Sequence, residues 1–110
     1  MLLRSEHTER RLFGALLCEP GVLEWCPLTE PDDFSDLHLQ FAFAAIRNLQ
    51  ARAEAINLGS VEDELFRLGY IQVDMLRVGN TAHKPDYNHQ ILVELDARWL
   101  RRLANRRRNV

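Results

Sequence analysis

Apolar residues along the chain recur at the three- and four-residue spacing of α-helices, whereas strict alternation of apolar and polar residues is rare. This pattern predicts an all-α fold. Helices are expected at about 6–18, 36–53 and 61–68, with a short helix at about 22–26. The acidic segment 29–35 is expected to be a loop. The first part of the chain is therefore predicted to form a small orthogonal helical bundle of about four helices.

The remainder of the chain carries two further helical patterns. A short helix is expected at about 72–78, and Pro85, which suits the first position of a helix, precedes a long one at about 86–107. Two helices joined by a short connection commonly pack as an antiparallel pair. The predicted organisation is a single domain spanning all 110 residues. It has a globular head at about 5–69 and a helical hairpin at about 70–108.

Two residues mark the ends of the helix expected at 61–68. Ser60 followed by Asp63 resembles a capping box, in which the first side chain accepts a hydrogen bond from a backbone amide of the first helical turn. Ser60 is therefore predicted to be the N-cap. Gly69 suits the left-handed conformation that commonly follows the last residue of a helix.

The long helix carries an apolar line at helical spacing. A projecting hairpin has too little core of its own to cover this line, so we predict an exposed patch through which two copies associate. A two-fold contact centred on Trp99 would bury an aromatic anchor. The alternative is that the line packs inside the hairpin, against the shorter helix. The predicted oligomer interface comprises Leu92, Leu95, Trp99 and Leu103.

The net charge of −2 conceals an uneven distribution of charge. Residues 19–36 contain six acids and no Lys or Arg, and residues 97–110 contain six arginines and no acid. The arginines have two interpretations: they contact phosphates or a partner, or they complement the dipole of a helix C-terminus. Stacking aromatic residues are absent from 100–110, so DNA binding is expected to be weak at most. The candidate phosphate or partner contacts are Arg101, Arg102, Arg106, Arg107 and Arg108.

No constellation of catalytic residues is found. The five glycines are scattered singly and none precedes a Lys-Ser/Thr pair, so neither a phosphate-binding loop nor a nucleotide cofactor is expected. The four histidines lack the spacing of a helical zinc site, so no metal is expected. The two cysteines are read as small buried residues. No apolar run is long enough to cross a membrane, and a cytoplasmic protein without a membrane partner is expected.

Several short motifs follow one another in a fixed order along the first two thirds of the chain. They are Leu12-Phe13-Gly14-Ala15-Leu16-Leu17, Asp33-Phe34, Phe43-Ala44-Ala45-Ile46 with Leu49, Ile56-Asn57, and Ser60-Val61-Glu62-Asp63-Glu64-Leu65. This series resembles the N-terminal domain of DnaB-type replicative helicases, and from Asp33 to Leu65 the match needs no gaps. The chain departs from the family pattern at Leu39, where the family commonly has His, and at Asn57, where it prefers Asp.

The resemblance implies an all-α domain that is not the motor of the helicase. In that family the domain assembles copies, as homodimers and as a trimer of dimers in the full-length protein, and receives primase or a helicase loader. Because the ATPase domain of the family has no counterpart in this sequence, the chain itself is not expected to be an enzyme. Two alternatives remain open: a stand-alone helicase-binding adaptor, and a small nucleic-acid-binding protein that uses its arginine-rich end.

Overall fold

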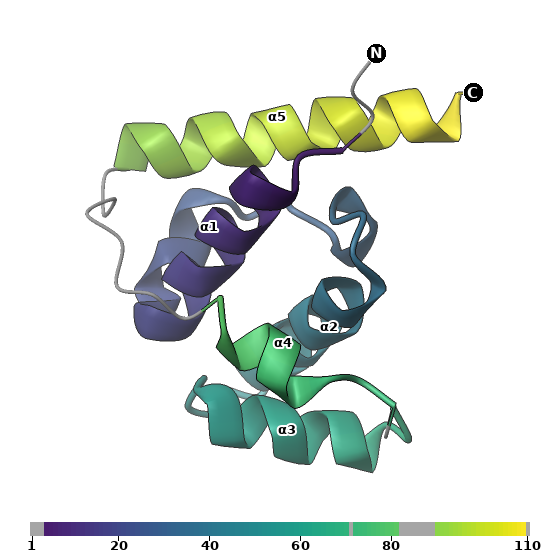
Figure 1. The fold of residues 1–110 in the computed structure, drawn as a ribbon. Helices are drawn as coiled ribbons and strands as arrows, with labels where there is room; N and C mark the ends of the chain where they lie inside the picture. Colours follow the sequence, from purple (N-terminus) through teal and green to yellow (C-terminus); the bar gives the residue numbers. More distant parts are fainter. Residues whose placement is uncertain (1–3, 71, 82–89, 110) are drawn as a thin grey trace.

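The computed structural model describes residues 4–70, 72–81 and 90–109, and every element in these ranges is helical, which confirms the all-α prediction (Figure 1). The helices are α1 (Glu6–Cys18), α2 (Leu37–Ala51), α3 (Leu58–Arg67), α4 (Met75–Gly79) and α5 (Gln90–Arg108). Two short 3-10 helices, η1 (Pro20–Trp25) and η2 (Pro31–Asp33), lie between α1 and α2. The expected acidic loop therefore contains a helical turn.

The core is built around the predicted apolar stripes of α1 and α2. Phe34, which precedes α2, meets the ring of Phe13 edge-on, with the two centroids 6.0 Å apart. On its other side it lies 5.3 Å from the ring of Phe43. All three rings are fully buried. Such aromatic contacts add to the free energy gained from burial, which makes this the anchor between the two helices.

The start of α3 differs from the prediction by three residues. Asn57, not Ser60, is the N-cap, because its backbone is extended and its side chain accepts a hydrogen bond from the Ser60 amide. Ser60 is the third residue of the helix and completes the capping box, because its hydroxyl accepts a hydrogen bond from the Asn57 amide. At the other end Gly69 has a φ of 84°, which confirms its predicted role after the last turn of the helix.

The last two helices pack on different elements of the head. Helix α4 packs on α2, whereas α5 packs on α1, η1 and η2. Figure 1 shows α5 lying over α1 on one side of the molecule, with α3 and α4 on the other. The expected helix start at Pro85 lies outside the described residues. Within them, α5 packs along its length on α1, η1 and η2.

Helix α5 lies against the head through an inward stripe that the apolar line did not reveal. The stripe combines apolar residues with one carboxylate, so it is less conspicuous in the sequence than the line of larger residues beside it. Its members are Val93, Asp96, Leu100, Leu103 and Ala104. Because this stripe is buried, Leu92 and Leu95 of the apolar line face outward, whereas Leu103 of that line belongs to the stripe itself.

Candidate protein interface on helix α5

A paired charge secures the first half of α5 to α1. The guanidinium of Arg11 donates to both carboxylate oxygens of Asp96, over 2.8 and 2.9 Å. Asp96 is buried, and a bidentate contact of this kind fixes orientation as well as distance. Together with the buried apolar residues of the inward stripe, the contact therefore fixes the rotation of α5 about its axis, and with it the residues that α5 presents to solvent.

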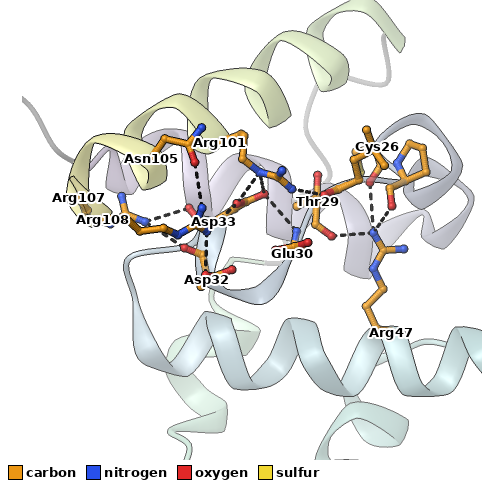
Figure 2. A network of polar contacts seen from close by, with 12 residues as sticks. Cys26, Thr29, Glu30, Asp32, Asp33, Arg47, Arg101, Asn105, Arg107 and Arg108 are labelled. Atoms are coloured by element: carbon orange, nitrogen blue, oxygen red, sulfur yellow. Dashed lines mark hydrogen bonds and ion pairs between the residues drawn. The ribbon is translucent and has the colours of Figure 1, made fainter.

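The second half of α5 is held by the acidic segment. The Nε of Arg101 lies 2.8 and 3.0 Å from the two carboxylate oxygens of Asp33, which is fully buried in η2 (Figure 2). Arg101 also donates to the carbonyl oxygen of Leu28. Asp33 accepts a further hydrogen bond from the amide of Glu30. A buried carboxylate needs such a full set of donors, because its desolvation is otherwise costly.

Two more of the predicted arginines extend the same connection. Arg107 donates to the carbonyl oxygens of Asp32 and Asp33, each over 3.3 Å. Arg108 lies 2.7 Å from the Asp32 carboxylate. The acidic segment and the basic end of the chain thus bind one another within the same molecule (Figure 2).

The other arginines of α5 face solvent. Arg98, Arg102 and Arg106 are exposed, and no hydrogen bond or ion pair joins them to any other residue in the described part of the chain. Their four-residue spacing places them in one stripe along the helix. Of the five predicted contacts, Arg102 and Arg106 therefore remain available to a ligand, and Arg98, which the sequence analysis did not select, joins them.

The residues of the predicted oligomer interface divide between the surface and the core. Leu92 and Leu95 are 44% and 51% exposed, and Trp99 is partly exposed. Leu103 is fully buried and belongs to the inward stripe, so it cannot meet a second copy. Ile91, 63% exposed, takes its place on the surface. We call Ile91, Leu92, Leu95 and Trp99 the apolar face of α5.

A groove of about 870 Å³ lies beside this face. On the α5 side its lining includes Leu95, Arg98, Trp99 and Arg102, and the opposite wall comes from the end of η1 and the segment that follows it, including Trp25 and Leu28. Sequence reasoning missed the groove because its two walls are about 70 residues apart, and only the placement of α5 brings them together.

The buried acids of the head complete its internal polar network. Glu64 accepts hydrogen bonds from Asn48, Arg52 and Arg67, and the donated bonds of Arg67, followed by those of Arg52, hold the pKa of that carboxyl well below its usual range. Glu9, also buried, accepts from the amides of Ser35 and Asp36 at the start of α2. These side chains stabilise the fold and leave no open coordination site.

The described residues contain neither a cluster of metal ligands nor a helix that could span a membrane. No group of three or more potential metal ligands comes together among them, and none of their helices is long and apolar enough to span a bilayer. His38 uses its Nδ1 to accept a hydrogen bond from the Asp74 amide, while His83 and His89 lie outside the described ranges. Burial of Cys26 raises the pKa of its thiol, whereas Cys18, expected to be buried, is exposed.

Fold and surface together define a small all-α domain in which the buried polar groups serve packing and the last helix presents an apolar face. The family model described as the DnaB-like helicase N terminal domain matches residues 1–91, and the chain belongs to that family. This confirms the resemblance that its motifs indicated and makes it an N-terminal domain of the replicative helicase type.

A solved structure is also similar to this chain. The crystal structure of the N-terminal domain of DnaB helicase from Mycobacterium tuberculosis matches with a TM-score of 0.78 at 19% identity, over 96% of this chain and 77% of that one. At this identity the likeness shows the fold alone. None of the curated protein sequences matches the chain significantly.

Proposed function

We propose that this chain is a non-catalytic domain of a replicative DNA helicase that joins copies of itself and docks a partner, primase or a helicase loader, in the cytoplasm. The observation that carries the proposal is the apolar face of α5. Its exposed leucines and isoleucine are adjacent on one helix, and a contiguous apolar surface of this kind is typical of a protein interface.

The burial of Leu103 defines where a two-fold contact would be centred. A contact centred on Trp99 would place Leu95 of one copy opposite Leu103 of the other, which is inaccessible. Centred on Leu95, an antiparallel contact would set Ile91 against Trp99 of the second copy and Leu95 against its equivalent. The proposed dimer therefore uses the first half of α5, with the aromatic anchor at each end.

The family membership supports a non-catalytic role. The scattered glycines form no phosphate-binding loop, and the family model that matches describes an N-terminal domain. We infer that nucleotide chemistry is performed by a separate domain, and that this one contributes contacts. Sequence-independent DNA binding is a weaker candidate, because Arg101, Arg107 and Arg108 are already bound to the acidic segment.

Self-association is tested by sedimentation velocity over a range of protein concentrations. The wild-type chain should dimerise, and Leu92→Asp, which places a charge on the apolar face, should shift the equilibrium to monomer. Phe66→Asp is a matched control, because Phe66 is also highly exposed but lies on α3. A wild-type chain that stays monomeric, or a Leu92→Asp variant that dimerises normally, contradicts the assembly role.

Docking is tested separately by titrating purified primase and purified loader from the same replication system into the domain. One of them should bind, and the domain alone should hydrolyse no ATP. Binding of neither protein would contradict the docking role, and ATP hydrolysis would contradict the non-catalytic one.

A further inference from the structure

The groove beside α5 is open to solvent and has an apolar floor. Leu28 is 79% exposed and Leu95 51% exposed, while Trp25 and Trp99 are partly exposed. Tryptophan and leucine side chains that are left partly uncovered on the two walls of one groove provide pockets for apolar anchors. A volume of about 870 Å³ accommodates several side chains rather than one.

The wall opposite α5 is held in place before any ligand arrives. Arg47 of α2 donates to the carbonyl oxygens of Pro27 and Thr29, over 2.9 and 2.8 Å (Figure 2). From the other side, Arg101 donates to the carbonyl oxygen of Leu28. The backbone that carries Leu28 is thus fixed by two guanidinium groups. Preorganisation of this kind lowers the entropic cost of binding.

The rim of the groove is basic. Arg98 and Arg102 line it and make no ion pair within the described residues, whereas the charge of Asp33 is already matched by Arg101. Glu94, the remaining acid of the lining, keeps its charge because its partner Gln90 is neutral, but the two arginines outnumber it. The accessible charge at the rim is therefore positive, although the chain as a whole carries −2. A complementary occupant carries carboxylates beside its apolar residues.

We propose that this groove binds an acidic amphipathic helix of a partner protein. Apolar residues of that helix at positions i, i+4 and i+7 would enter the groove, and acidic residues on its flanks would pair with Arg98 and Arg102. The exposed aliphatic side chains of Leu28 and Leu95 favour an apolar helix over nucleic acid. Trp25 and Trp99 also offer faces on which bases could stack, so an oligonucleotide is one of the probes below. The inference deepens the docking part of the proposed function and rests on it.

The test uses three labelled probes followed by fluorescence anisotropy. One is a synthetic helical peptide with leucines at i, i+4 and i+7 and glutamates at its flanking positions. The second has glutamine in place of each glutamate, and the third is a single-stranded oligothymidylate. The glutamate peptide should bind saturably and about tenfold or more tightly than the glutamine peptide, because two ion pairs depend on it.

Variants at the groove establish where the peptide binds. The double change Arg98→Glu/Arg102→Glu should weaken binding of the glutamate peptide by about tenfold or more, since two attractive contacts become repulsive. Leu28→Ser should also weaken it. The matched control is Arg4→Glu/Arg10→Glu, which changes the net charge equally at exposed positions that do not line the groove and should leave affinity unchanged.

Three results would overturn the proposal: no saturable binding of the glutamate peptide, equal binding of the glutamine peptide, or binding that survives both groove variants. Tighter binding of the oligothymidylate would assign the surface to nucleic acid instead.

Measuring dimerisation and peptide binding on the same protein variants distinguishes failure of the groove proposal from failure of the assembly role. Leu95 and Trp99 belong to both surfaces, so the monomeric background is Leu92→Asp, because Leu92 does not line the groove. A wild-type chain that dimerises, together with a monomeric Leu92→Asp variant that binds no peptide, overturns the groove alone. A monomeric wild-type chain that binds the peptide overturns the assembly role alone. Binding of primase or loader that the groove variants leave unchanged would place docking elsewhere on the domain.

Discussion

Arg101 and Asp33, separated by 68 positions in the sequence, form the ion pair that joins the last helix to the acidic segment. Asp33 is fully buried and Arg101 about one-third exposed, so the pair lies at the boundary between the core and the surface. The acidic segment and the basic end of the chain, which the sequence shows as separate charged regions, therefore contact each other within one molecule. The same pair shapes the groove, because Arg101 also binds the Leu28 carbonyl.

Asp33→Asn should destabilise the domain by about 1–3 kcal/mol, since the change weakens the contact to Arg101 and the hydrogen bond from the Glu30 amide. The free energy of unfolding is measured by urea titration. Asp32→Asn is the matched control: Asp32 is exposed, and losing its pair with Arg108 should cost less than about 1 kcal/mol. Equal losses of unfolding free energy in the two variants would show that the buried pair stabilises the domain no more than the exposed one.

Glu64→Gln should make stability less dependent on pH. The pKa of Glu64 is lower in the folded chain than in the unfolded one, because Arg67 and Arg52 donate hydrogen bonds to its charged form. The stabilisation is therefore fully present above the unfolded value of about 4.3 and is lost as the pH falls below it. Urea titrations at pH 7 and pH 3 measure the effect.

The difference between wild type and Glu64→Gln should be largest at pH 7 and smaller at pH 3. Glu62→Gln, an exposed change on the same helix, should match wild type within about 0.5 kcal/mol at pH 7. A Glu64→Gln difference that is the same at both pH values would contradict the assignment of the shift to this cluster.

Glu9→Gln should destabilise the junction between α1 and α2 by about 1–3 kcal/mol. Both backbone amides donate to Oε1 of the buried Glu9 and the Ser35 hydroxyl donates to its Oε2, whereas glutamine can accept at one of these two atoms only. Thermal unfolding followed by circular dichroism measures the loss. Glu6→Gln is the control, since Glu6 is exposed in the first turn of the same helix and should change the free energy of unfolding by less than about 0.5 kcal/mol.

The helices of the head could be predicted because their signals are local. Helix α1 has the bounds that its apolar stripe indicated, and Gly69 ends α3 as expected. The start of α3 was missed since Asn57 and Ser60 are both good caps, and only the backbone geometry selects between them. Local patterns thus define the elements to within a few residues.

The arrangement of α5 could not be read from the sequence in the same way. Large apolar residues occur on both sides of this helix, and Leu103 belongs to the apolar line and to the inward stripe, so hydrophobicity alone does not say which side is buried. The placement of α5 depends on contacts distant in sequence, among them the ion pair between Arg11 and Asp96. The groove follows from that placement of α5, and so does the division of the arginines into bound and exposed ones. Neither could be predicted from the sequence.

The two sides of α5 should respond differently to truncation. Leu103→Ala should cost about 2–5 kcal/mol of stability, because Leu103 is fully buried and the change leaves a cavity. Leu92→Ala should cost less than about 0.5 kcal/mol, since Leu92 is 44% exposed in the monomer. Urea titration at a concentration where the chain is monomeric measures both, and sedimentation velocity measures self-association. Leu92→Ala should weaken the dimer while the monomer stays folded. A Leu103→Ala variant of wild-type stability would contradict the rotation of α5 described above, and would return Leu103 to the surface where the apolar line alone had placed it.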